Sequence, residues 1–127
     1  MVADLFSGSA RVAHALKAAG WRVVANDHLA FAQVLALGTV QADAERWSLR
    51  AQKLLAELSH LPPAPGWFTH TYAHEARYLH PVNAARLEAM REAIRRLDPE
   101  PELAAILLVA LLQAADRVDS TAGHQMS

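Results

Sequence analysis

Residues 2–10 read VADLFSGSA, a short apolar run that closes with an acid, an aromatic residue and a turn of small residues. Apolar residues at helical spacing follow, which predicts a helix over 11–19. We expect Ser9 to cap this helix and Gly20 to end it. A strand that stops at a glycine turn and enters a helix is typical of α/β proteins that bind nucleotide-like ligands.

The stretch WRVVA at 21–25 is rich in β-branched residues and is closed by Asn26 and Asp27, so it predicts a second strand. The two strands and the helix between them form a strand–helix–strand unit, whose strands should be parallel. Further helices are predicted over 28–37, with its end at Gly38, and over 44–58, 81–97 and 102–115.

The middle of the chain is less regular. LPPAPG at 61–66 is incompatible with regular structure and predicts a loop. WFTHTY at 67–72 has strand composition, yet Pro81 follows closely, so a strand and an ordered loop with a short strand are both open here.

Composition limits the class of protein. With 127 residues, of which 53% are hydrophobic, the chain is long enough for one core. A formal net charge of −1 gives no overall basic field, so any contact with nucleic acid has to be local. The absence of cysteine excludes disulfides and thiolate chemistry. The longest apolar run, at 104–112, is shorter than the roughly 20 residues of a membrane span, so a cytoplasmic protein without membrane contact is expected.

The opening turn does not carry the glycines of a dinucleotide site. GxGxxG is the pattern that lets the backbone approach a pyrophosphate, and the corresponding window here is GSARVA. A ligand without phosphate needs fewer special residues. It requires one close approach of the backbone at the turn, an acid to meet an ammonium group and a second acid for ribose hydroxyls. Asp4 and Asp27, 23 residues apart, supply both acids. S-adenosylmethionine fits these demands, and a tight turn without any ligand is the alternative.

Three segments carry a resemblance to a known family. They are DLFSGSARVAHALKAAGWRVVANDHLAFAQVL at 4–35, GWFTHTYAHEARYLHPVNAARLEAMREAIRRL at 66–97 and LLVALLQAADRVDSTAG at 107–123. In this order they resemble the D12 class of DNA adenine-N6 methyltransferases. The resemblance implies an α/β, Rossmann-like fold of S-adenosylmethionine-dependent methyltransferases, incomplete in this chain. Residues 1–60 would form the cofactor-binding strand–helix–strand part, and 61–127 a truncated helical insert similar to a target-recognition segment.

Carried over by position, the resemblance implies that Asp4, Phe6 and Gly8 border the methionine and adenine parts of the cofactor and that Asp27 meets the ribose. Ala10 departs from the family, which usually has a glycine there. If this position needs a positive φ, the methyl group is a penalty, and glycine at position 10 should bind the cofactor more tightly.

A second departure concerns catalysis. The family's catalytic motif is Asp or Asn followed by two prolines and an aromatic residue, and it is absent here, because Pro62 and Pro63 follow Leu61 and precede Ala64. No catalytic residue and no metal ligand is therefore assigned. We expect a fragment of an enzyme that transfers a methyl group from S-adenosylmethionine to adenine in double-stranded DNA, usually within restriction-modification systems. A non-catalytic remnant or binding module is the alternative, and DNA contact should be weak or lost.

Other residues have less specific interpretations. His70, His74 and His80 have spacings that allow zinc ligation, but without an HExxH pattern ordinary loop histidines are favoured. The arginines of 77–96 are interleaved with acids, which favours a solvated helix face with ion pairs over a DNA-phosphate surface. Tyr72 and Tyr78 are candidates for stacking on a base, although packing is the more common role of such residues.

Overall fold

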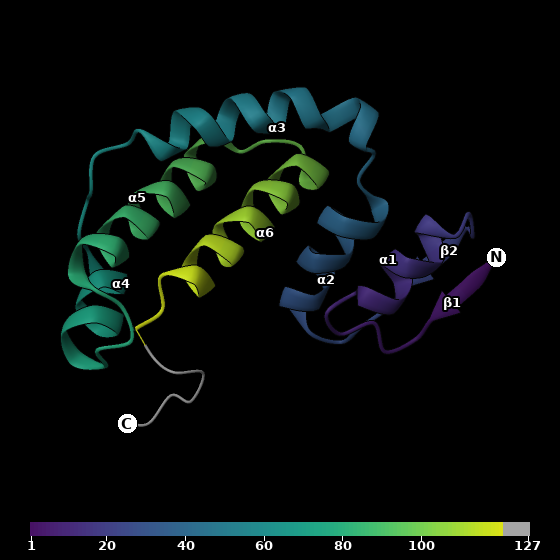
Figure 1. Cartoon of the computed structure of the whole chain (residues 1–127), viewed down its shortest axis with the longest axis horizontal. Helices are drawn as coiled ribbons and strands as arrows, with labels where there is room; N and C mark the ends of the chain where they lie inside the picture. Colours follow the sequence, from purple (N-terminus) through teal and green to yellow (C-terminus); the bar gives the residue numbers. More distant parts are fainter. Residues whose placement is uncertain (121–127) are drawn as a thin grey trace. The chain divides into compact units, whose positions relative to one another are not determined.

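The computed structural model describes residues 1–120, which are mostly helical with one two-stranded parallel sheet. Ten elements follow one another along the described chain, and Figure 1 labels the strands and the α-helices among them. They are β1 (Val2–Asp4), α1 (Arg11–Ala18), β2 (Val23–Ala25), α2 (Ala30–Ala36), the π-helical η1 (Leu37–Gln41), α3 (Ala44–Ser59), α4 (Trp67–Thr69), the π-helical η2 (His70–Glu75), α5 (Pro81–Leu97) and α6 (Pro101–Arg117).

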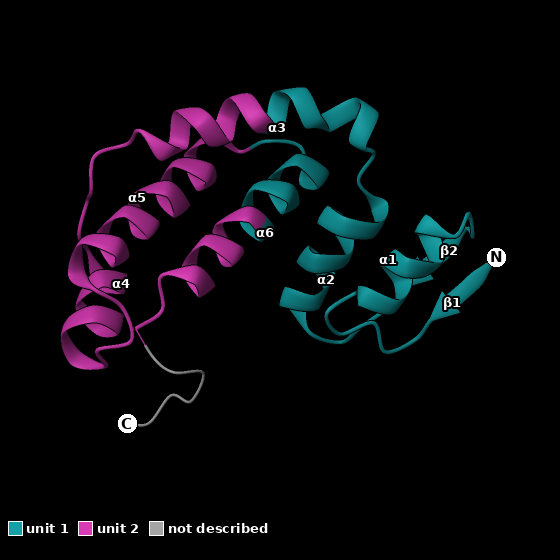
Figure 2. Cartoon of the chain, viewed as in Figure 1, with its two compact units in different colours: residues 1–51, 99–109 teal, residues 52–98, 110–127 magenta. Residues whose placement is uncertain are grey.

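The described chain divides into two compact units, shown in different colours in Figure 2. The first consists of residues 1–51 and 99–109, and the second of 52–98 together with the chain from 110 onward. The predicted helices over 44–58, 81–97 and 102–115 are confirmed as α3, α5 and α6.

The strand–helix–strand unit is confirmed within the first unit. β1 pairs in parallel with β2, with Val2 opposite Val23 and Asp4 opposite Ala25. Gly20 ends the helix between them as predicted: its φ is +87°, and it lies one residue beyond the C-cap of α1. The amide of Trp21 donates to the Leu16 carbonyl at 3.0 Å, which closes a Schellman motif.

The predicted cap of α1 is wrong. Ala10, not Ser9, is the N-cap residue, its backbone is left-handed with φ +60°, and no side chain caps the helix. Ala10 is fully buried and packs with Ala13 and Val40 in the core of the first unit. The residue at the start of α1 is therefore held by packing of its methyl group, and no side-chain hydrogen bond of the kind predicted for Ser9 is formed.

The predicted helix end at Gly38 is also wrong, because η1 continues α2 to Gln41. A Cβ on Gly38 would lie 3.1 Å from the Ala105 backbone, so this glycine allows close packing against α6. Lys17 at the end of α1 donates to the carbonyls of Val40 (2.5 Å) and Ala42 (2.9 Å). These bonds satisfy carbonyls at the end of η1, where the helical ladder stops.

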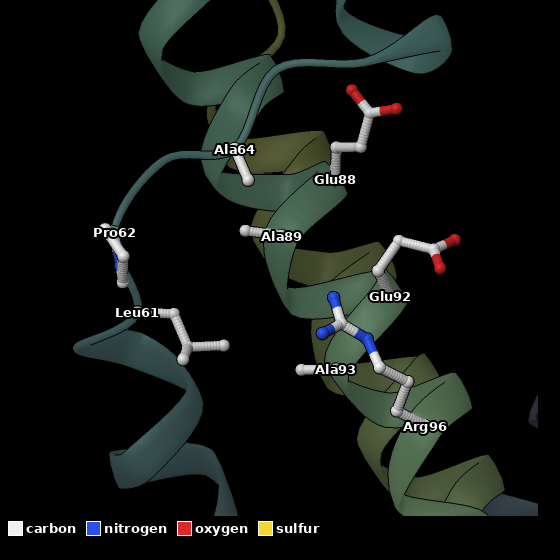
Figure 3. A pocket seen from close by; sticks show the side chains of 8 residues that line it. All are labelled: Leu61, Pro62, Ala64, Glu88, Ala89, Glu92, Ala93 and Arg96. Atoms are coloured by element: carbon white, nitrogen blue, oxygen red, sulfur yellow. The ribbon is translucent and has the colours of Figure 1, made fainter.

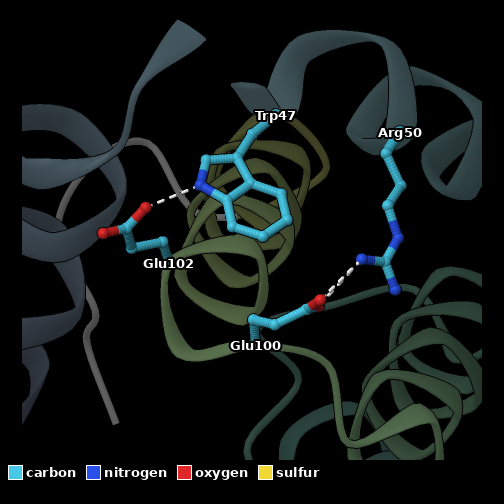
Figure 4. Close-up of polar contacts among 4 residues, drawn as sticks. All are labelled: Trp47, Arg50, Glu100 and Glu102. Atoms are coloured by element: carbon cyan, nitrogen blue, oxygen red, sulfur yellow. Dashed lines mark hydrogen bonds and ion pairs between the residues drawn. The ribbon is translucent and has the colours of Figure 1, made fainter. Parts of the chain in front are cut away.

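Polar contacts tie α3 to the start of α6 within the first unit (Figure 4). The indole Nε1 of Trp47 donates to Glu102 at 2.6 Å, and Arg50 forms an ion pair with Glu100 at 2.8 Å. The hydrogen bond from the Trp47 side chain is the main cause that lowers the pKa of Glu102. An acid in the first turn of α6 is also favoured by the helix dipole.

The segment 67–75 is helical, so both a strand and a loop with a short strand were wrong predictions. Its core-facing residues explain the outcome: Phe68, Tyr72 and Ala73 pack with Leu87 in the buried cluster of the second unit. Their spacing fits a helical turn, and burial against α5 overrides the strand propensity of the aromatic residues.

Candidate functional site

The candidate site is the turn between β1 and α1, together with the residues that follow β2. The carboxyl ends of parallel strands meet at one edge of a sheet, which is where open α/β sheets bind ligands. The backbone links the two loops, since Asn26 donates to the Asp4 carbonyl at 2.8 Å and Ser7 donates to the Asn26 carbonyl at 3.0 Å. The structure therefore brings together two segments about 20 residues apart in sequence.

Gly8 and Asp27, which the resemblance assigns to the cofactor, are in direct contact. The Gly8 amide donates to Oδ2 of Asp27 at 2.8 Å, and the Leu29 amide donates to Oδ1 at 3.0 Å. These backbone bonds, from Leu29 first and then Gly8, lower the pKa of Asp27 and keep it ionised. An ionised carboxylate has about four acceptor positions, so Asp27 can accept a further hydrogen bond, as contact with a ribose hydroxyl requires.

Gly8 has φ +48°, a left-handed backbone that favours glycine. Ala10 shares this conformation two residues later, so the condition under which its methyl group is a penalty is met. The turn thus contains two left-handed residues in three, a backbone path with strain at the alanine.

Asp4 lies at the end of β1, and its Oδ2 atom is buried with no hydrogen-bond partner among the described residues. The Oγ atom of Ser7 is in the same state, and Ser7 as a whole is 7% exposed. A buried polar atom without a partner costs on the order of 1–3 kcal/mol, so native proteins pair such atoms with protein, water or ligand. A carboxylate and a hydroxyl beside the uncapped start of α1 match the ammonium and carboxylate of an amino acid.

Phe6 is separate from this polar cluster. It is 91% exposed and is not among the residues that pack on the buried cluster of the first unit. The resemblance places Phe6 beside the cofactor, and a ring this exposed is available to cover an adenine or another apolar surface.

Ser7 was not among the candidate site residues predicted from the sequence. A serine in a small-residue turn is ordinary, and its only signal was its position between Phe6 and Gly8 in the opening stretch.

The three histidines at 70, 74 and 80 are not assembled into a metal site, because residues 1–120 contain no group of three or more histidines or acids placed to hold a metal ion. His70 instead lies 3.5 Å from Glu75 as an exposed pair.

The α5 arginines are partly ion-paired, as predicted: Arg95 contacts Glu92 at 2.9 Å, one helical turn away.

A groove of about 270 Å³ lies beside α5 in the second unit (Figure 3). Leu61 and Pro62 of the loop line one side of it, while Ala89, Ala93 and Arg96 of α5 line the other. No polar atom that is both buried and unpartnered points into this groove, in contrast to the β1–α1 turn.

The parallel strands, the glycine turn and the two acids form an arrangement of the kind that α/β proteins use to bind small ligands. Comparison with known proteins gives the family: the model of the D12 class N6 adenine-specific DNA methyltransferases matches residues 1–127, and the chain belongs to this family. Its members methylate adenine in DNA, which makes DNA the substrate of the family's reaction. No curated protein and no solved structure matches the chain. Among residues 1–120 no helix has both the length and the apolar character to cross a membrane.

Proposed function

We propose that this chain binds S-adenosylmethionine at the β1–α1 turn and contributes the donor half of a DNA adenine-N6 methyltransferase. The observation that carries the proposal is the pair of buried, unpartnered oxygens of Asp4 and Ser7 beside Gly8 and Asp27. The Asp4 carboxylate accepts hydrogen bonds from the ammonium group of the methionine part, and the Asp27 carboxylate accepts a hydrogen bond from the ribose hydroxyls. Gly8 gives close approach to the ligand, and Phe6 covers the adenine.

S-adenosylmethionine supplies an activated methyl group on a sulfonium. The chain's own residues would bind and orient the donor, because the two acids and the turn fix both ends of the same molecule. The proposed division of labour assigns the cofactor to residues 1–60 and a target-recognition role to 61–127. A Rossmann-like sheet would extend β1 and β2 with further strands, which agrees with the exposure of Val24 on β2.

We further propose that the chain does not methylate DNA unaided. An exocyclic adenine amine is a weak nucleophile, and the target base has to be extruded, held and aligned with the donor. The Asp/Asn-Pro-Pro-aromatic motif that performs this task in the family is absent from the 127 residues. DNA contact is expected to be weak and sensitive to salt, because the arginines of α5 alternate with acids. The alternative, a non-catalytic binding module, shares these expectations and differs only in having no enzymatic partner segment.

Two measurements test the proposal. Calorimetric titration with S-adenosylmethionine should show binding that Asp4→Ala weakens, while Asp116→Ala, an exposed acid on α6, leaves it unchanged. Absence of binding by the parent chain would refute the cofactor assignment. Incubation with tritiated S-adenosylmethionine and adenine-containing duplex DNA should leave the DNA unlabelled. Protein-dependent label on adenine N6, abolished by Asp4→Ala, would show that the acceptor site lies within these residues.

A further inference from the structure

Trp67 is an exposed aromatic residue held by an unusually well-bonded turn in the second unit. It is 72% exposed, although it starts α4 and is flanked by residues that are partly or fully buried on the helix side. Leaving an indole in water forgoes the burial energy of a large apolar ring. An exposed tryptophan on a rigid support therefore indicates a contact made with another molecule.

The support begins with the backbone. Glu88 of α5 accepts the amides of Gly66 (2.7 Å), Phe68 (3.0 Å) and Thr69 (2.9 Å) and the Thr69 hydroxyl (2.6 Å). These donors bracket Trp67 on both sides, so its Cα position is fixed relative to α5. A Cβ on Gly66 would lie 2.6 Å from a Glu88 oxygen, which shows how closely the turn fits the carboxylate.

Side-chain packing continues the support. The Trp67 ring meets Tyr72 edge to face at 6.0 Å and 87°, and Tyr72 packs on Phe68 at 4.8 Å. Phe68 and Tyr72 in turn pack on the buried cluster. An aromatic series thus runs from the core to an exposed indole, and such pairs favour defined ring orientations.

The flanking residues favour a nucleic acid as the partner. Between 67 and 80 the chain has one acid, Glu75, against Arg77 and three histidines. His74, Arg77 and His80 are exposed and are therefore available to phosphates. Aromatic rings interleaved with side chains that donate hydrogen bonds to phosphates are typical of surfaces on which bases stack.

We infer that Trp67 stacks on an unpaired or extruded base of DNA, with the exposed side chains of His74, Arg77 and His80 beside the phosphates. This inference rests on the proposed function, because it takes DNA as the substrate. It assigns Trp67 a part in holding the strand, whereas nothing in the family's catalytic motif involves this residue. Indole stacking is tolerant of base identity, so the contact contributes affinity rather than sequence recognition.

The test uses the whole chain and a duplex that carries 2-aminopurine at a mismatched position, at low salt. Binding is followed by fluorescence anisotropy, and stacking by quenching of the 2-aminopurine. Trp67→Ala should weaken binding about 5- to 150-fold and abolish the quenching, the range found when a stacking aromatic is truncated. Trp67→Phe should retain most of both signals, and Trp21→Ala, which removes another half-exposed tryptophan, should change neither.

The outcomes separate the two claims. Equal binding and quenching by the parent and Trp67→Ala would overturn the stacking role and leave DNA binding intact. A parent chain that binds no DNA would overturn both. If Trp67→Ala leaves DNA binding unchanged but converts a dimer into a monomer in sedimentation, the indole belongs to a contact between copies of the chain, and the inference is wrong. Thermal melting of each variant confirms that the comparison is made between folded proteins.

Discussion

Asp27 shows how one side chain serves both the fold and the candidate site. Its carboxylate accepts the amides of Gly8 and Leu29, so it connects the loop after β2 to the turn after β1. The same two bonds orient the carboxylate and lower its pKa, which suits the contact with ribose hydroxyls that we propose for it. The structural role of Asp27 and its proposed ligand-binding role are therefore coupled, and experiments on it need a readout for each.

Replacement of Asp27 by alanine is expected to weaken S-adenosylmethionine binding about ten- to a hundredfold, because it removes hydrogen bonds to a charged group. Calorimetric titration measures the affinity, and circular dichroism measures whether the turn still folds. Asp27→Asn should give an intermediate loss, since the amide keeps one acceptor oxygen. Equal affinity in Asp27→Ala and the parent would remove Asp27 from the site.

Two opposing contributions to the free energy of unfolding act at Ala10. The left-handed backbone at φ +60° favours glycine, while the fully buried methyl group contributes packing. Release of strain is worth about 1–2 kcal/mol, and loss of a buried methyl group together with the entropy of glycine costs a similar amount. We expect Ala10→Gly to change the free energy of unfolding by less than about 1 kcal/mol, whereas Ala10→Val should be strongly destabilising. Urea denaturation checks both, and a large loss in Ala10→Gly would show that packing outweighs strain.

Among the elements, α4 and η2 depend most on distant residues. Glu88 takes the place of a local N-cap for this helical segment, because its carboxylate accepts amides 19 to 22 residues away in sequence. The Pro-rich loop before it contributes no side-chain cap of its own. Stability of the segment should therefore follow the chemistry of α5.

Gly66→Ala tests the fit between this turn and α5. The added Cβ would meet a Glu88 oxygen at 2.6 Å, which forces the carboxylate away from its donors. We expect a loss of about 1–3 kcal/mol in unfolding free energy, the cost of leaving charged-group hydrogen bonds unmade. Gly20→Ala is not a suitable control because of its positive φ, so Ala64→Ser at an exposed loop position serves as the neutral comparison. Equal stability of Gly66→Ala and the control would show that the turn shifts without cost.

Glu88 also predicts a pH dependence. Burial raises the pKa of Glu88, but the hydrogen bonds from Thr69, Phe68 and Gly66 outweigh it and leave the pKa below its ordinary value of 4.5. Because the pKa is lowered in the folded state, the stabilisation is fully present above 4.5 and is lost as the pH falls through the lower folded value. Denaturation at a series of pH values should show that the free energy of unfolding falls less steeply toward acid pH in Glu88→Gln than in the parent. An identical slope would contradict the role of Glu88.

Large apolar side chains are exposed in both units of the described chain. The first unit has only two strands, and large apolar side chains of its strands, turns and helices are exposed, among them Leu5, Phe6, Trp21, Val24 and Phe31. Parallel sheets are normally covered on both faces, so this exposed apolar surface is available for contact with other protein surfaces.

We expect the isolated chain to bind a hydrophobic dye and to associate as its concentration rises. Phe31→Ser, which removes a 57% exposed ring from α2, should reduce both effects without loss of helix content. Sedimentation over a range of concentrations measures the association. A strictly monomeric parent with no dye binding would refute this expectation.

Local sequence signals predicted the elements that their own periodicity specifies. The long helices α3, α5 and α6, the strand pair and the end of α1 at Gly20 were predictable because apolar spacing and a C-terminal glycine act within one element. Family membership was also readable from the chain, since the segments that carry it are contiguous.

Other features arise from contacts between residues far apart in the chain. The helical state of 67–75 depends on burial of Phe68 and on the carboxylate of Glu88, neither of which is visible within the segment. The contact of Gly8 with Asp27, the left-handed backbone of Ala10 and the unpartnered oxygens of Asp4 and Ser7 likewise follow from how β1, β2 and α1 pack. Propensity and motif describe a residue's neighbours along the chain, whereas a hydrogen bond or a buried methyl group depends on neighbours in space, and packing is the stronger term.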